Sequence, residues 1–242
     1  MEFPKTLIKR NGYIERIKPF MRKNIAKVLT GQRRVGKSFL LYQLMEQLLA
    51  EEPDANIIYI NFEDFAFSHI QTAEDMHAYI MSKVRKEKYN YIFVDEIQEI
   101  VNFERVIRSL LLNENNDIYI TGSNAKMLSG ELATYLSARY IEFSVYSLSY
   151  LEFLEFHKLE NNNESLYLYS RYGGLPYLVN LPLKDETVNE YLKSVYSTIV
   201  FRDVVSRYNL RNSSFLEKLV QFLSENIGNL FSAKNISDYL KS

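Results

Sequence analysis

The run Gly31-Gln32-Arg33-Arg34-Val35-Gly36-Lys37-Ser38 has the residue types and spacing of a phosphate-binding loop, G-x-x-x-x-G-K-[ST]. Such a loop directs backbone N–H groups toward one point, and the dipole of the following helix adds positive potential there. The pattern predicts that Lys37 contacts the β- and γ-phosphates of a nucleotide and that the Ser38 hydroxyl binds Mg²⁺. The predicted nucleotide-binding residues are Gly31, Gln32, Arg33, Arg34, Val35, Gly36, Lys37, Ser38 and Phe39.

The segments on either side of this loop support the prediction. Residues 25–30 read as a short strand, and apolar side chains from Phe39 to Leu49 recur at helical spacing. This helix should end before Pro53, because a proline disfavours helical backbone in the residue that precedes it. A strand, a glycine loop and a helix follow one another as phosphate binding requires. The alternative is a glycine-containing turn with an unrelated lysine.

A pair of acidic residues, Asp95-Glu96, follows the apolar strand that we predict over 91–95. In open α/β sheets, ligands bind at the carboxyl ends of the strands, so these carboxylates should face the phosphate loop. Asp95 is expected to help bind Mg²⁺, and Glu96 to act as general base toward a water molecule. The alternative is an acidic pair that only begins a helix.

Three further positions are candidates with open alternatives. Asn124, after the strand predicted over 117–123, would contact the γ-phosphate or orient the water; Ser123-Asn124 also suits a plain turn and helix cap. Arg139 would stabilise phosphoryl charge, in cis or from a neighbouring chain, or form an ordinary ion pair. Arg33 and Arg34, inside the phosphate loop, would contact phosphates or a loop carboxylate.

The order of predicted elements indicates an α/β fold. Apolar strands at 57–62, 91–95, 117–123 and 141–145 alternate with helical segments, which is typical of a parallel sheet with right-handed crossovers. From about residue 149 the periodicity becomes helical, interrupted at Gly173-Gly174. We therefore predict a P-loop core with a parallel sheet over residues 1–148 and a smaller, all-helical C-terminal region.

Taken together, these motifs resemble a family of prokaryotic AAA+ ATPases. The resemblance rests on a Walker A loop at 31–38, a Walker B strand with its Asp-Glu pair at 91–96, and a sensor segment at 121–124. Similar segments at 95–98, 136–140 and 172–176 extend the match from about residue 8 to the C-terminus. The resemblance implies a helical lid, assigned to 149–210, and the beginning of a winged-helix region at 211–242. Members of this family usually continue into a nuclease-like C-terminal domain, which we do not expect within residues 1–242.

Composition narrows the possible partners and location. The chain has no cysteine, which excludes disulfides and thiolate metal sites and agrees with a cytoplasmic location. It contains no apolar run of the roughly 18 residues that span a membrane. Residues 1–38 carry 11 basic and 2 acidic side chains, whereas the remainder carries 18 basic and 28 acidic. This basic segment suits an anionic partner, either ATP/ADP alone or DNA as well, or it is only a solvated basic surface.

Two functions of different kinds are therefore predicted. The first is Mg²⁺-dependent binding and hydrolysis of ATP, with the nucleotide state coupled to domain movement. The second is a nucleotide-gated module that regulates DNA or a protein partner with negligible hydrolysis. A small-molecule kinase uses the same loop, but Glu96 beside Asp95 suits activation of water better. Oligomerisation is compatible with either function.

Overall fold

The computed structural model describes residues 4, 7–123, 136, 139–199 and 213–241, and these divide between two compact units, 1–180 and 181–242. The larger unit begins with α1 (Asn11–Ile17) and η1 (Lys18–Phe20). Its core then contains β1 (Ala26–Gly31), α2 (Lys37–Glu51), β2 (Asn56–Asn61), η2 (Phe65–Phe67), α3 (Ala73–Lys83), β3 (Asn90–Asp95), η3 (Ile97–Glu99), α4 (Phe103–Leu110), β4 (Asn116–Ser123) and β5 (Tyr140–Ser144). The unit ends with α7 (Tyr150–His157), α8 (Asn163–Tyr172) and η4 (Pro176–Asn180).

The five strands form one sheet in the order β2-β3-β4-β1-β5, and every pairing is parallel. This confirms the predicted α/β class. β1, which leads into the phosphate loop, lies between β4 and β5 although both follow it late in the chain. β4 and β5 therefore pair with β1 from either side, and β1 is an interior strand of the sheet. The loop after β1 lies at the carboxyl edge with a neighbouring strand on each side.

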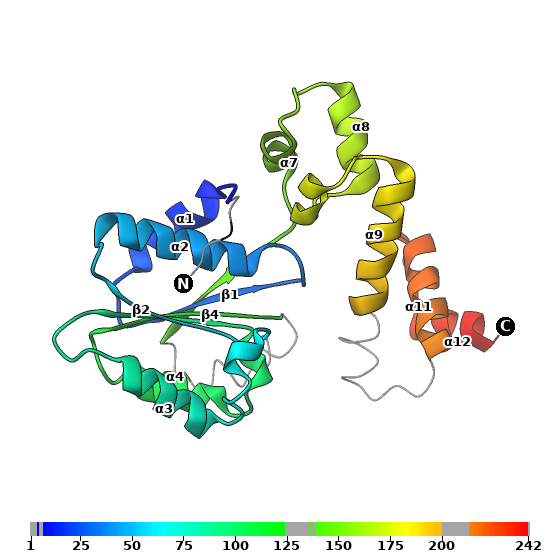
Figure 1. Cartoon of the computed structure of the whole chain (residues 1–242). Coiled ribbons are helices and arrows are strands. Elements are labelled where there is room, and N and C mark those ends of the chain that lie inside the picture. Colours follow the sequence, from blue (N-terminus) through cyan, green and yellow to red (C-terminus); the bar gives the residue numbers. More distant parts are fainter. Residues whose placement is uncertain (1–3, 5–6, 124–135, 137–138, 200–212, 242) are drawn as a thin grey trace. The chain divides into compact units, whose positions relative to one another are not determined.

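Helices cover both faces of the sheet, with α1 and α2 on one face and α3 and α4 on the other (Figure 1). Successive side chains of β3 point to opposite faces of the sheet. Tyr91 and Phe93 pack toward α1 and α2, while Ile92 and Val94 pack toward α3 and α4. All four side chains are fully buried. A strand covered on both faces should be apolar throughout, which is why 91–94 shows no polar alternation.

Local signals account for where the helices begin and end. α3 starts after Thr72, whose hydroxyl accepts a hydrogen bond from the Asp75 N–H at 3.1 Å while the Asp75 carboxylate accepts one from the Thr72 N–H at 3.0 Å. This capping box satisfies two N–H groups that the first helical turn leaves unpaired. α2 ends at Glu51, two residues before Pro53, as predicted.

Beyond the sheet, the chain passes close to itself at Gly174. The Leu148 N–H donates to the Gly174 carbonyl at 2.7 Å, and a Cβ on Gly174 would lie 2.2 Å from the Leu148 carbonyl oxygen. Only glycine allows this approach, which joins the α8–η4 turn to the segment that precedes α7. The predicted lid begins at 149, and the contacts that define the first unit extend to Asn180.

We expect Gly174→Ala to destabilise the protein, because the added methyl group meets backbone that cannot rotate away. Overpacking of this kind costs about 1–3 kcal/mol. Gly12→Ala is the matched control, since Gly12 lies in α1 and a Cβ there meets no atom within 4 Å. Thermal unfolding should show a lower Tm for Gly174→Ala and an unchanged or higher Tm for Gly12→Ala. Equal Tm values would contradict the close approach.

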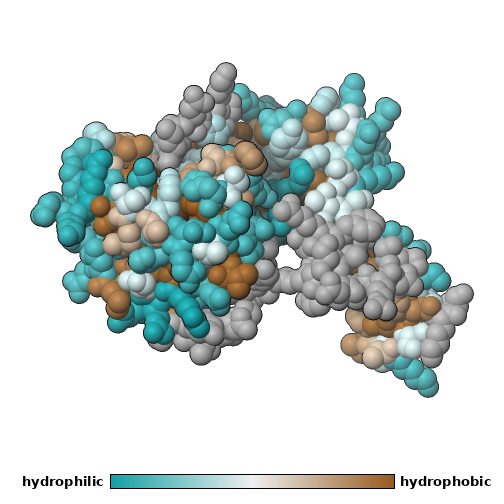
Figure 2. Space-filling model, turned by 60° about the horizontal axis from the view of Figure 1, so that its bottom comes forward, coloured by the Kyte–Doolittle hydropathy of each residue, from teal (hydrophilic) through white to brown (hydrophobic). Residues whose placement is uncertain are grey.

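The smaller unit contains α9 (Asp185–Thr198), α11 (Ser213–Glu225) and α12 (Ala233–Lys241). Apolar side chains remain exposed around the turn between α11 and α12, among them Ile227, Leu230 and Phe231. Figure 2 shows hydrophobic residues gathered at this end of the chain, whereas on the core they lie among hydrophilic ones. Within the described residues, the helices are too short or too polar to cross a membrane.

Candidate functional site: a phosphate loop beside two acidic residues

The ends of three neighbouring strands bring the predicted residues together. Gly31, the last residue of β1, pairs with Ser123 of β4, and Val94 of β3 pairs with Ile120 of β4. The strands are parallel, so the loop after β1 and the acidic pair after β3 lie at the same edge of the sheet, on either side of the end of β4. The structure thus brings residues 31–38 and 95–96 into one site.

The backbone of the loop has the shape that phosphate binding requires. Gly31 has φ 147°, and a Cβ there would lie 2.2 Å from the Val145 carbonyl oxygen. Gly36 has φ 95° and leads directly into α2, with Leu40 N–H donating to the Gly36 carbonyl at 3.1 Å. These left-handed residues turn the chain so that successive N–H groups can face one anion at the helix N-terminus.

Lys37 is buried beneath the loop, with its side chain 3% exposed. Its ammonium donates to the carbonyl oxygens of Gly31 at 3.0 Å and Gln32 at 3.1 Å, and lies 3.9 Å from Glu96 Oε1. Burial lowers the pKa of Lys37, and the Glu96 and Asp95 carboxylates oppose this effect. A phosphate anion at the loop would favour the charged ammonium further, so the position of Lys37 suits a phosphate ligand.

Asp95 is held by three hydroxyl groups. The Ser38 and Thr121 hydroxyls hydrogen-bond its carboxylate, and the Tyr59 hydroxyl lies 3.5 Å from Oδ2. Burial raises the pKa of Asp95, whereas the bonds from Ser38 and Thr121 lower it. A carboxylate and a hydroxyl oxygen side by side are the oxygen ligands that Mg²⁺ prefers, so the donor set fits this ion.

Glu96 has the backbone of a residue under strain, with φ 55° in the left-handed region. Its N–H donates to Thr121 Oγ1 at 3.0 Å, and its carboxylate accepts a hydrogen bond from the Gln98 side chain. Left-handed conformations at non-glycine residues cost energy and are concentrated at functional sites. Here the turn aims Glu96 toward Lys37 instead of continuing away from the sheet.

No individual role was predicted for Thr121 or Gln98, although both lie in segments that carry the family resemblance. Thr121 orients both acidic residues, because its hydroxyl donates to Asp95 and accepts from the Glu96 N–H. The strand register could have pointed to Thr121. Ile120 of β4 pairs with Val94 of β3, so Thr121, the next residue, lies opposite the end of β3. Finding it requires knowing that β3 and β4 are neighbours, which strand-like periodicity alone does not tell.

The remaining predicted residues are placed differently. Arg33 forms an ion pair of 3.3 Å with Glu63, which matches the expected contact with a carboxylate, and Phe39 is about half exposed, 47%, on α2. Arg34 adopts φ 66° inside the loop. Asn124 lies outside the described residues.

Arg139 is not brought to the phosphate loop. It precedes β5, and its carbonyl accepts a hydrogen bond from the Ala26 N–H at 3.0 Å, at the beginning of β1. Residues before parallel strands lie at the sheet edge opposite the carboxyl ends, and the Arg139 side chain is exposed there. The prediction of a role in cis has no geometric support in this chain; a role toward a neighbouring chain stays a prediction.

Comparisons of the sequence and the structure with known proteins show which family the chain belongs to. A protein from Haemophilus influenzae, named only as uncharacterized, is 36% identical over 248 residues, covering 98% of this chain and 60% of that protein. An uncharacterized protein from Methanocaldococcus jannaschii is 30% identical over 233 residues, covering 90% of this chain and 50% of that protein. The chain therefore spans half to three fifths of the length of these two curated relatives.

Among solved structures, the chain is similar to the ORC1 protein of Aeropyrum pernix in complex with DNA, with a TM-score of 0.47 and 13% identity. That match covers 98% of this chain and 78% of the other. A family model for a domain of unknown function (DUF8612) matches residues 163–242. The model of the AAA domain matches residues 23–154, which include the phosphate loop, both acidic residues and the whole sheet. Since this is more than half of the chain, the protein belongs to the AAA domain family and has a P-loop AAA+ ATPase fold.

Proposed function

We propose that this chain binds ATP with Mg²⁺ at the carboxyl edge of the sheet and hydrolyses it. The observation that supports this most is the convergence of Lys37, Asp95 and Glu96 at the phosphate loop, with the Ser38 hydroxyl on Asp95 and the Lys37 ammonium 3.9 Å from Glu96. Phosphoryl transfer to water requires a cation that binds phosphate, oxygen ligands for a metal ion and a carboxylate that activates the water. All three kinds of group are present here.

Each residue has a defined role in this proposal. The N–H groups of 31–38 and the Lys37 ammonium bind the phosphates, while Ser38 and Asp95 hold Mg²⁺, which would neutralise phosphate charge. Glu96 accepts a proton from the attacking water as the water oxygen bonds to the γ-phosphorus. The bond from that phosphorus to the bridging oxygen breaks, and its electron pair leaves with ADP. Asn124 would orient the water, and an Arg139 from another copy would stabilise phosphoryl charge.

The contacts of Glu96 favour a second candidate function. Its carboxylate accepts a hydrogen bond from the Gln98 side chain and lies 3.9 Å from the Lys37 ammonium, so part of its capacity to accept a proton from water is already used in this state. A site that stays in this arrangement would hold ATP without hydrolysing it. The chain would then act as a nucleotide-gated module for DNA or a protein partner, through the helices that follow the core.

The deciding experiment compares the chain with Lys37→Ala for ATP binding by calorimetry and for Mg²⁺-dependent phosphate release, with and without duplex DNA. Loss of the buried ammonium should weaken ATP binding about tenfold to a hundredfold, the range for hydrogen bonds to charged groups. Removing Mg²⁺ with EDTA should stop phosphate release. Lys88→Ala is the matched control, since Lys88 pairs with Asp54 at the surface.

The outcomes separate the two functions. Phosphate release that requires Lys37 and Mg²⁺ supports hydrolysis, and a change on adding DNA identifies the partner class. Lys37-dependent ATP binding without phosphate release supports the nucleotide-gated module. If neither ATP binding nor phosphate release depends on Lys37, both proposals are wrong.

A further inference from the structure

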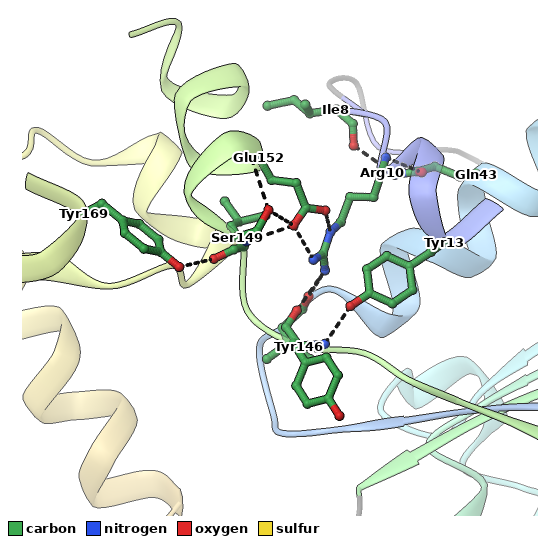
Figure 3. Close-up of polar contacts among 10 residues, drawn as sticks. Ile8, Arg10, Tyr13, Gln43, Tyr146, Ser149, Glu152 and Tyr169 are labelled. Atoms are coloured by element: carbon green, nitrogen blue, oxygen red, sulfur yellow. Dashed lines mark hydrogen bonds and ion pairs between the residues drawn. The ribbon is translucent and has the colours of Figure 1, made fainter. Parts of the chain in front are cut away.

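Arg10 connects the phosphate loop to the first helix beyond the sheet. Its side chain is 3% exposed, and its guanidinium donates to both carboxylate oxygens of Glu152, at 2.7 Å and 3.0 Å (Figure 3). The same guanidinium donates through Nη1 to the carbonyl oxygens of Val35, at 3.1 Å, and Tyr146, at 3.0 Å. One buried group thus joins the loop, the segment after β5 and α7.

The loop has a physical need for such a donor. When the N–H groups of a phosphate loop face the ligand, some of its carbonyl groups must face the protein interior. Val35 is 1% exposed, so its carbonyl loses water and requires a donor there. Arg10 supplies this donor from outside the loop and α2.

Further contacts of Arg10 and its neighbours fix its position. The Arg10 backbone N–H donates to Gln43 Oε1 at 2.9 Å, and the Gln43 side-chain amide donates to the Ile8 carbonyl at 2.9 Å. Its guanidinium lies 4.5 Å from the centre of the Tyr13 ring, and the Tyr13 hydroxyl accepts from the Tyr146 N–H at 3.0 Å. These contacts to α2 and α1 hold the guanidinium at a fixed place behind the loop.

Glu152 is held equally firmly on the other side. Ser149 and Glu152 form the capping box of α7, in which the Ser149 N–H donates to Glu152 Oε2 at 2.9 Å. The Glu152 carboxylate that pairs with Arg10 is therefore also part of the N-terminal cap of α7. A shift of the Val35 carbonyl would move Arg10, and with it the N-terminus of α7.

We propose that Arg10 is a positioning residue for the nucleotide: it holds the Val35 carbonyl so that the loop keeps its binding shape, and through Glu152 it links that shape to α7. The inference deepens the proposed ATP binding and rests on it for its functional consequence. Arg10 touches no phosphate in this proposal; it acts through the loop. Its effect should therefore be visible in the loop even before any nucleotide is added.

The test measures amide hydrogen exchange of residues 31–38 without nucleotide, and calorimetric ATP affinity, in Arg10→Ala, Arg10→Lys and Glu152→Gln. Arg22→Ala is the matched control, because Arg22 also pairs with a glutamate, Glu52 at 2.9 Å, but at the opposite edge of the sheet. We expect Arg10→Ala to speed exchange in the loop and raise the Kd for ATP, each about tenfold or more. Arg10→Lys and Glu152→Gln should give smaller changes, since each keeps some of the hydrogen bonds.

The two readouts distinguish this role from a merely structural one. If Arg10 only supports folding, the folded molecules keep the wild-type Kd and loop exchange, and calorimetry shows fewer binding sites; that result overturns the proposal. If Arg10→Ala does not fold, Arg10→Lys carries the same comparison. If the wild-type protein binds no ATP, the proposed function fails, while faster loop exchange in Arg10→Lys than in Arg22→Ala still supports the positioning role and equal exchange overturns it.

Discussion

Replacing Glu96 with glutamine should lower ATP turnover by about two to four orders of magnitude, the contribution expected of a general base. Glutamine has the shape of glutamate but cannot accept the proton from water. ATP binding should be retained, because Lys37, Ser38 and the loop N–H groups are unchanged. It should even tighten, because the change removes a negative charge 3.9 Å from the Lys37 ammonium that the phosphates would contact. Phosphate release at saturating ATP, beside calorimetric affinity, measures the two effects separately.

The control for this experiment lies three residues away. Glu99 is an exposed carboxylate in η3, on the same turn as Glu96 but with its side chain in solvent. Glu99→Gln should leave both turnover and affinity close to wild type, since exposed charges act weakly on one another in water. Normal turnover in Glu96→Gln would remove Glu96 from the mechanism. Weak binding in the same variant would mean that Glu96 holds the loop in place instead.

The second large effect concerns stability rather than chemistry. Lys27 and Asp117 form a fully buried ion pair, with side chains 0% and 1% exposed, near the beginnings of β1 and β4. Lys27 also donates to the Ile25 carbonyl at 2.7 Å, and Asp117 accepts from the Tyr119 hydroxyl at 2.7 Å and the Arg22 N–H at 2.8 Å. Burial lowers the pKa of Lys27, which the Asp117 carboxylate opposes.

We expect Asp117→Ala to destabilise the protein by about 3–5 kcal/mol, because it leaves the Lys27 ammonium buried without its partner. The double variant Lys27→Met with Asp117→Ala should recover part of this loss, since no uncompensated charge remains. Chemical denaturation measures both values. Lys88→Ala, which removes an ion pair with the largely exposed Asp54, should change the stability far less, because water screens exposed charges. A loss for Asp117→Ala no larger than that of Lys88→Ala would contradict this account.

Short-range patterns in the sequence predicted most of the elements. The glycine loop, the end of the following helix before Pro53 and the four apolar strands depend on residues within a few positions of one another, and each is found within about one residue of where the pattern placed it. The residue types that meet at the site, Lys37 with Asp95-Glu96, were also predictable, because a glycine loop after one strand and an acidic pair after another are distinct in the sequence; their chemical roles stay predictions. That both lie at the carboxyl edge follows from the parallel sheet alone.

What the sequence by itself determined was therefore the local chain geometry and the residue types that meet at the site. The tertiary structure decided which strands are neighbours, and through that the role of Thr121, which reaches Asp95 and Glu96 only because β4 lies beside β3. It also decided that Arg139 lies at the far edge and that Arg10 lies behind the loop, bonded to Glu152 142 residues away. Periodicity reports which side of an element is buried, not what it is buried against, so contacts between distant segments become visible only when the chain is folded.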